Sequence, residues 1–271
     1  MSGHGLWDMF GLWPASDAPA AQPLTNAQLA ILRRNVPYRR RLPLTARRRL
    51  QSLTLAFLAE KASAFEGCNG LRVTDEMRVT IAAQACILLL GLDIPCYPEL
   101  RSVLIYPDAY RAHCRERGKD GVTVEGAQGR SGQSWRGLVV LAWDVVRRDP
   151  AETAHRQNLV LHEFAHHLAA ETGAVDGIPQ LRDPKRDRAW RKTLTKAHSR
   201  LAADVAAGRP TFLRKYAATN THEFFAVLTE AFFEASAALR TEHPELYDQL
   251  RVFYRQDPAN LPPNSDRLGA S

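Results

Sequence analysis

Two histidines and a glutamate within residues 159–173, LVLHEFAHHLAAETG, have the types and the spacing of a metal site. His162 and His166 are four residues apart, so on a helix their imidazoles stand one turn apart on nearly the same face and can bind one ion. Glu163 is rotated by about 100° from His162, which places it beside such an ion. A carboxylate there can take a proton from a water molecule that the ion activates. The pattern His-Glu-x-x-His therefore predicts a helix that binds a metal and uses it for hydrolysis.

The alternative is a buried helix that carries a polar stripe without a metal. With nine histidines in the chain, the bare pattern arises by chance in about one or two of a hundred such sequences. The neighbouring helix positions are apolar, and burying His, Glu and His together without partners would cost several kcal/mol. The metal site is therefore the favoured interpretation. His167 points about 100° away from His166, so we expect it beside the site or exposed.

The local sequence predicts that the motif lies on a helix over residues 150–172. Asp149 is the expected N-cap, Pro150 fits the first helical position, and Glu152 completes a capping box. Gly173 is the expected end of the helix.

A hydrolytic metal site also needs a third protein ligand, because such sites keep three protein ligands and one open position. The extended motif with a nearby third histidine is absent, since Ala169 and Thr172 occupy its Gly and His positions. The ligand is therefore expected within residues 215–234, KYAATNTHEFFAVLTEAFFE. The candidates there are His222, Glu223, Glu230 and Glu234.

Glu223 is weakly favoured because it stands at the start of a predicted helix in an apolar context. Its alternative role is the N3 carboxylate of a capping box that Asn220 begins. Glu230 lies two helical turns further along the same face, where a carboxylate could orient one of the histidines. The residues alone leave this choice open.

The rest of the chain predicts an α+β fold in which helices come first. Amphipathic and apolar helices are expected between residues 24 and 100, including a core helix with Thr74 as its N-cap and Gly91 as its stop. Short β-branched runs predict strands at 102–106, 122–125 and 137–143. Helices are predicted after the motif at 187–207, 221–239 and 244–255.

The composition disfavours a disordered, a collagen-like and a membrane protein. Hydrophobic residues make up 45% and charged residues 24% of the 271, as in soluble globular domains. The longest apolar run, residues 81–92, is too short to span a membrane, and no secretory signal is expected at the N-terminus. We therefore expect a cytoplasmic protein with no membrane partner, in which all four cysteines remain thiols without a catalytic role.

The net charge of +7 comes largely from arginine, with runs at 33–41 and 47–49. Such runs suit nucleic acid or an acidic partner. No stacking aromatics or nucleic-acid motif accompany them, so a solvated helix face is favoured and nucleic acid is not the expected partner.

Five stretches of the chain, taken in order, resemble the Mlc titration factor A family. They are GLRVTDEMRVTIAAQACILLLGL, VLIYPDAY, GLVVLAWDVV, NLVLHEFAHHLAAETGAVDGIP and YAATNTHEFFAVLTEAFFE. The resemblance covers roughly residues 24–258. It implies a cytosolic, zinc-dependent peptidase of the gluzincin type, with a catalytic core similar to the anthrax lethal factor protease domain. In a few bacteria members also bind the glucose-responsive repressor Mlc.

The resemblance also implies roles for individual residues. His162 and His166 match the histidine ligands, Glu223 matches the third ligand, and Glu163 matches the general base. Tyr216 matches the tyrosine that stabilises the oxyanion, a role that suits a phenol O–H donor.

One position departs from the family, because His222 stands where a small residue is more frequent. This histidine could compete for the ion or tune the ligand beside it.

We therefore expect a predominantly helical single domain with a small mixed sheet and a zincin-like core. Its predicted bounds are 24–258, divided into a helical part, 24–100, and a catalytic core, 101–258. Residues 1–23 are expected to form a loosely ordered arm and residues 259–271 a C-terminal tail.

The expected function is a zinc-dependent, aminopeptidase-like peptidase with one Zn²⁺ per chain and a peptide or protein substrate. The strand at 137–143 is expected to offer an edge along which a peptide aligns. A transcriptional repressor is the expected second partner. The alternative is a regulatory protein that sequesters a transcription factor and whose catalysis is secondary or vestigial.

Overall fold

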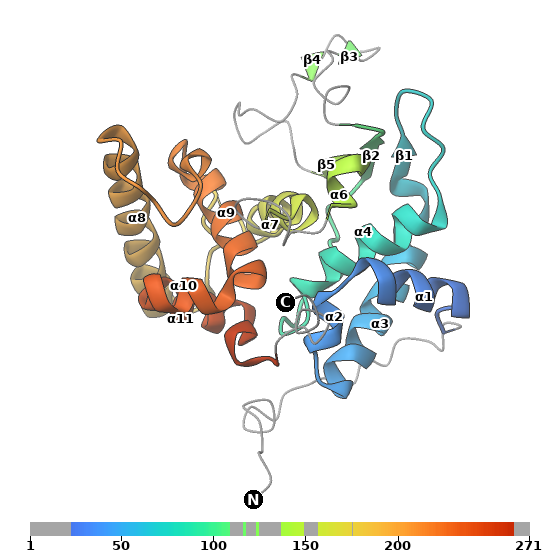
Figure 1. Ribbon diagram of the computed structural model, residues 1–271, viewed down its shortest axis with the longest axis horizontal. Helices are drawn as coiled ribbons and strands as arrows, with labels where there is room; N and C mark the ends of the chain where they lie inside the picture. Colours follow the sequence, from blue (N-terminus) through green and yellow to red (C-terminus); the bar gives the residue numbers. More distant parts are fainter. Residues whose placement is uncertain are drawn as a thin grey trace, which may run out of the picture.

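The computed structural model describes residues 23–108, 116–117, 123–124, 137–148, 157–174 and 176–262. Over these residues the chain is mostly helical with a small parallel sheet, so the predicted α+β class is confirmed (Figure 1). The helices are α1 (Asn26–Asn35), α2 (Tyr38–Arg41), α3 (Leu44–Glu60), α4 (Asp75–Ile87), α6 (Trp143–Val146), α7 (Leu159–Glu171), α8 (Pro184–Ala206), α9 (Thr221–Glu234), α10 (Ser236–Glu242) and α11 (Pro244–Tyr254). The 3₁₀ helices are η1 (Ala62–Ala64), η3 (Lys215–Ala218) and η4 (Pro258–Asn260). The strands are β1 (Phe65–Gly67), β2 (Ser102–Tyr106), β3 (Glu116–Arg117), β4 (Thr123–Val124) and β5 (Leu138–Ala142).

The helix α4 forms the centre of the N-terminal half. Thr74 is its N-cap, as predicted, and its hydroxyl accepts a hydrogen bond from the backbone N–H of Met77 at 3.3 Å. Every residue from Val79 to Ile87 is buried, which explains why this helix is apolar on all sides. The helix ends at Ile87 rather than at Gly91. Gly91 is needed for another reason, because a Cβ there would lie 2.3 Å from the carbonyl oxygen of Tyr254.

The main sheet has the order β1-β2-β5, and all its strands are parallel. Val103 of β2 pairs with Phe65 of β1 on one side and with Val139 of β5 on the other. The mixed sheet that the sequence suggested is therefore wrong in detail, although the strands near 102–106 and 137–143 are confirmed. The predicted strand at 122–125 overlaps β4, which pairs antiparallel with β3 in a separate small sheet.

The motif helix α7 begins at Leu159, so the predicted start at residue 150 is wrong. Asn158 is the actual N-cap, and its side-chain oxygen accepts a hydrogen bond from the backbone N–H of Leu161 at 3.1 Å. The predicted capping box at 149–152 lies outside the described residues. Gly173 follows the helix in the left-handed region with φ 83°, as expected of a residue that ends a helix.

The C-terminal helices differ from prediction at two points. Asp183 caps α8, which therefore starts at Pro184, three residues before the expected position. The predicted helix 221–239 is two helices, because Ala235 leaves helical geometry with φ −128° and ψ 32°.

Figure 1 places α7 in the middle of the molecule, between helices α8 to α11 on one side and α1 to α4 on the other. Its residues pack against α4, α9 and β5. The predicted N-terminal arm, apart from Pro23, and residues 263–271 of the tail lie outside the described residues. None of the helices in the described part of the chain is long and apolar enough to cross a membrane.

Candidate metal centre

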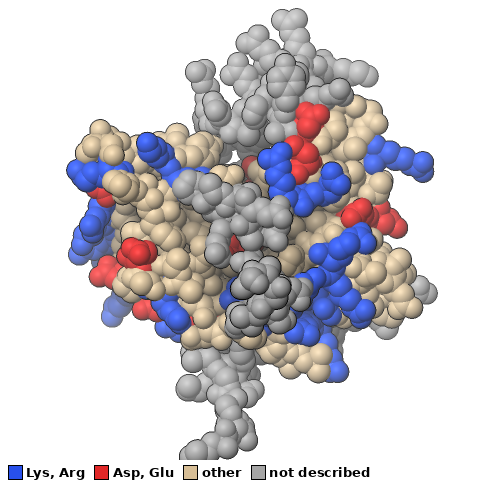
Figure 2. Space-filling view, in the orientation of Figure 1, with Lys and Arg blue, Asp and Glu red and all other residues tan. Residues whose placement is uncertain are grey.

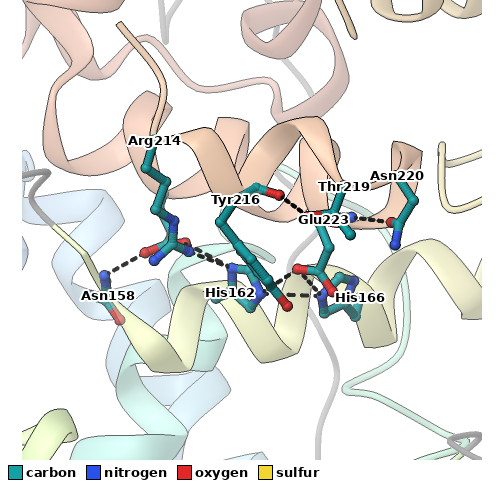
Figure 3. Close-up of polar contacts among 9 residues, drawn as sticks. Asn158, His162, His166, Arg214, Tyr216, Thr219, Asn220 and Glu223 are labelled. Carbon is teal, nitrogen blue, oxygen red and sulfur yellow. Dashed lines mark hydrogen bonds and ion pairs between the residues drawn. The ribbon is translucent and has the colours of Figure 1, made fainter. Parts of the chain in front are cut away.

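Three side chains from two crossing helices converge on one point (Figure 3). The Nε2 atoms of His162 and His166, both on α7, are 3.2 Å apart. The Oε2 atom of Glu223, from the first turn of α9, lies 3.1 Å from Nε2 of His162 and 3.5 Å from Nε2 of His166. His162 and Glu223 are buried and His166 is half-buried, so the cluster opens on the side of His166. The helical spacing of the motif is therefore realised, and the distant carboxylate completes it.

The spacing of these donor atoms fits a metal ion. A tetrahedral zinc ion, bound at about 2.0–2.2 Å by each donor, would hold its ligand atoms about 3.3–3.6 Å apart. The separations of 3.1, 3.2 and 3.5 Å between the donor atoms lie in or just below this range. Two imidazoles and one carboxylate are also a donor set that zinc commonly takes in catalytic sites.

The charges around His162 favour a cation. Burial opposes charge on the imidazole, but hydrogen bonds to Glu223 and Glu230 outweigh it and raise the pKa of His162 to about 10. Burial would likewise raise the pKa of Glu223, yet its contacts with His162 and His166 hold that pKa well below the usual range. The carboxylates thus favour positive charge at the rings, which a bound cation would also supply.

The local fold of α9 explains how Glu223 is presented. Asn220 caps the helix and accepts a hydrogen bond from the backbone N–H of Glu223 at 2.9 Å. This is half of the capping box that the sequence offered as the alternative role of Glu223. The carboxylate of Glu223 itself contacts both histidines, so it is in position to act as a metal ligand together with them.

Glu230 takes the orienting position that the sequence left open. Nδ1 of His162 lies 2.7 Å from Oε1 of Glu230, and the backbone N–H of Asn158 donates to Oε2 at 2.8 Å. Glu230 is only 3% exposed, so its carboxylate is held almost entirely by these partners and by Arg214. A carboxylate on Nδ1 leaves Nε2 facing Glu223 and His166, where it could bind an ion.

Sequence reasoning missed Arg214 and Asn158. The Nη2 atom of Arg214 pairs with Oε1 of Glu230 and lies 3.1 Å from Nδ1 of His162. Asn158 also donates through Nδ2 to Oε1 of Glu234 at 2.9 Å. One residue therefore caps α7 and joins it to α9. Asn158 had a usable signal, because Asn directly before an apolar helical run is a preferred N-cap.

Glu163 lies beside the cluster rather than in it, as predicted from the helical angle. Burial and the nearby carboxylates of Glu223 and Glu230 raise its pKa, although the two histidines act in the opposite direction. A carboxyl group with a raised pKa is better suited to accept a proton near neutral pH.

Tyr216 lies on η3, with its ring centroid 6.2 Å from that of His162. The guanidinium of Arg214 stands over the same ring at 5.6 Å. Burial, the charge of Glu223 and a hydrogen bond to that carboxylate raise the pKa of the Tyr216 phenol. The hydroxyl therefore stays protonated and can donate a hydrogen bond beside His162 and Glu223.

The two remaining histidines of these segments lie outside the set of donor atoms. His167 is buried, contacts the ring of Tyr97, and has its Nε2 atom 3.2 Å from Glu171. His222 lies against Gly177, where a Cβ would come within 2.3 Å of the imidazole. Neither joins His162, His166 and Glu223 in the group that could hold an ion.

Comparisons with known proteins show the family to which the chain belongs. The model of the family described as glucose-regulated metallo-peptidase M90 matches residues 12–255. An uncharacterized protein of Synechocystis sp., slr2042, is 37% identical over 240 residues, covering 88% of this chain and 86% of the relative. Mlc titration factor A of Pectobacterium atrosepticum is 32% identical over 252 residues, covering 91% and 92%. Mlc titration factor A of Serratia proteamaculans is 32% identical over 221 residues, covering 80% and 83%.

A histidine pair and a carboxylate around one point could hold a metal ion, and the family match assigns the chain to the class of the metallopeptidases. Within that class, this chain belongs to the glucose-regulated metallo-peptidase M90 family, and it is similar to the Mlc titration factor A proteins over most of its length.

Proposed function

We propose that the protein is a zinc-dependent peptidase of the gluzincin type, with a zincin-like core that resembles the anthrax lethal factor protease domain. The observation that carries the proposal is the triangle of donor atoms from His162, His166 and Glu223, with sides of 3.1–3.5 Å. Membership of a metallopeptidase family supports it independently. One Zn²⁺ per chain would be held by these side chains.

A divalent cation held by His162, His166 and Glu223 would supply a Lewis acid and would lower the pKa of a water molecule bound to it. Glu163, adjacent to the triangle and with a raised pKa, accepts the proton of the attacking water and returns it to the leaving amine. Tyr216 donates a hydrogen bond from its phenol hydroxyl to the carbonyl oxygen of the scissile peptide as negative charge develops there. Glu230 and Arg214 hold the imidazole of His162 in its orientation.

The sheet suggests how a peptide is bound. The strand β5 is at one edge of the order β1-β2-β5, and it packs against α7. An extended peptide that hydrogen-bonds to this edge would be recognised mainly through its backbone. We propose aminopeptidase-like cleavage. Amino-acid p-nitroanilides and internally quenched peptides, compared at equal concentration, distinguish cleavage at the amino terminus from internal cleavage.

The central test compares two variants. Glu163→Gln should retain near-stoichiometric zinc by elemental analysis and lose hydrolysis, because the proton acceptor is gone while the ligands remain. His166→Ala should lose both. Unchanged turnover of Glu163→Gln would remove Glu163 from its role, and unchanged zinc in His166→Ala would remove the metal site.

A repressor-binding role is the second candidate, and its support is the name of the relatives, Mlc titration factor A. We propose a transcriptional repressor as a partner beside the peptide substrate. The Glu163→Gln protein separates the two functions, since it should still retain Mlc in a pull-down if binding is independent of catalysis. The cytoplasmic location remains a prediction.

A further inference from the structure

The first three helices carry an excess of positive charge. Residues 24–59 contain eight arginines and no aspartate or glutamate. Figure 2 shows Lys and Arg gathered over the region that α1, α2 and α3 occupy in Figure 1. Any carboxylate that pairs with these arginines must therefore come from another segment. Arg34, for example, pairs with Glu76 of α4 at 2.8 Å.

Three of these arginines come together where α1, α2 and α3 meet. Arg40 donates to the backbone carbonyl of Arg33 at 3.4 Å, and Arg47 donates to that of Arg40 at 2.6 Å. A carbonyl oxygen orients a guanidinium without cancelling its charge. Burial, together with the charges of Arg47 and Arg33, lowers the pKa of Arg39, which is consistent with the closeness of the three groups. The result is a group of positive charges formed by Arg33, Arg39 and Arg47, in which backbone carbonyl oxygens orient the guanidinium of Arg47.

An exposed leucine lies beside this group. Leu44, the first residue of α3, is 64% exposed, and only Leu44 and Val252 are large hydrophobic residues with such exposure in the described part of the chain. Arg47 and Arg48 follow it by three and four residues, so all three share one face of the helix. The surface therefore combines positive charge with an apolar contact point.

The combination of positive charge with an exposed leucine favours an acidic protein segment over a nucleic acid as the partner. The aromatic residues of residues 24–59 are Tyr38 and Phe57, which are 7% and 0% exposed, so this segment offers no ring on which a base could stack. A phosphate backbone would also leave Leu44 without a partner. A protein segment with carboxylates and an apolar side chain satisfies both features of the surface.

We infer that the arginine–leucine surface, made of Arg33, Arg39, Leu44, Arg47 and Arg48, docks an acidic protein segment that carries an apolar side chain. The surface belongs to α1, α2 and α3, whereas the metal donors belong to α7 and α9. The inference therefore does not depend on the proposed catalysis.

The test is fluorescence anisotropy with a labelled helical peptide of glutamate, alanine and leucine, using the full chain. The charge variant is Arg33→Gln/Arg48→Gln, since both side chains are exposed, and the apolar variant is Leu44→Gln. Each should weaken peptide binding about fivefold or more, with the loss from the charge variant shrinking at high salt. The matched control is Arg186→Gln/Arg188→Gln, which removes the same charge from exposed positions on α8 and should leave binding within about twofold.

Two outcomes would overturn the inference. The first is an equal loss in the α8 control, which would mean that only the net charge matters. The second is a labelled DNA duplex that binds more tightly than the peptide and is insensitive to Leu44→Gln, which would assign the surface to nucleic acid. Thermal melting of every variant ensures that only folded protein is compared.

Discussion

The carboxylate of Glu230 lies 2.7 Å from Nδ1 of His162, on the side of the imidazole that faces away from Glu223. The same ring therefore contacts one glutamate through each nitrogen, and the two glutamates lie two turns apart on α9. One carboxylate is placed to bind an ion together with Nε2, and the other fixes the ring that presents Nε2. The contact explains why two residues of similar sequence context have different roles.

Replacing Glu230 tests this division of roles. Glu230→Gln removes the charge that orients His162, so we expect metal affinity to fall about 10–100-fold while the ligand atoms remain. Competition with a chromophoric chelator measures the change. Glu242→Gln, an exposed residue of α10, should bind metal as the wild type does. Equal affinity in Glu230→Gln would show that the carboxylate does not support the site.

We expect Arg214 to stabilise the fold, because its guanidinium compensates the buried negative charge of Glu230. The Arg214 side chain is 18% exposed and that of Glu230 is 4% exposed, so the pair is largely removed from water. Arg214→Met leaves a buried carboxylate with less compensation and should cost about 2–4 kcal/mol of unfolding free energy in the presence of chelator. Arg214→Lys keeps the charge but loses the planar fork, and should recover part of the loss. Urea denaturation measures both, and a Met variant as stable as the wild type would contradict this account.

Periodicity was sufficient to predict the local half of the site. His162 and His166 face one point because they are four residues apart on a helix, and that relation needs no tertiary information. The choice between Glu223 and Glu230 could not be made in this way. Both lie on the same face of α9, and only the crossing of α9 over α7 places one at Nε2 and the other at Nδ1.

The start of α7 depends on a tertiary contact that no local pattern reveals. The sequence pattern of Asp149, Pro150 and Glu152 predicts an earlier start, yet Asn158 caps this helix. Asn158 is held there by Glu230, which is 72 residues away in the chain. Arg214 is a still harder case, because its partner also lies on another element and no local pattern distinguishes it from the other basic residues.

The stability of the α1–α4 contact should depend on pH. Hydrogen bonds from Asn35 and Arg34 lower the pKa of Glu76 below its usual value. The ionised carboxylate therefore stabilises the fold above its unfolded-state pKa of about 4.3, and this contribution is lost as the pH falls through the lower folded-state pKa. Because the Glu76 side chain is 40% exposed, we expect only about 0.5 kcal/mol.

Urea denaturation at two pH values measures this contribution. Glu76→Gln should be less stable than the wild type at neutral pH and equally stable at a pH well below the lowered folded-state pKa of Glu76, where the carboxyl group is protonated. Glu60→Gln, an exposed change at the end of α3, should show no such difference between the two pH values. If Glu76→Gln stays less stable than the wild type in acid, the shape of the Glu76 side chain, rather than its charge, accounts for the stabilisation.

The contact of Gly177 with His222 links the loop after α7 to the proposed metal ligand Glu223. Gly177 has φ 78°, and a Cβ there would lie 2.5 Å from the Cα of His222, the residue directly before Glu223. Gly208 has a similar φ of 67° with nothing within 4 Å of the added Cβ, which makes it a matched control. Both alanine variants should lose about 1 kcal/mol from backbone strain. Gly177→Ala should lose a further 1–3 kcal/mol, since the backbone of α9 must shift, and should also weaken metal binding. Equal unfolding free energies and equal metal affinities for the two variants would show that this close approach does not position Glu223.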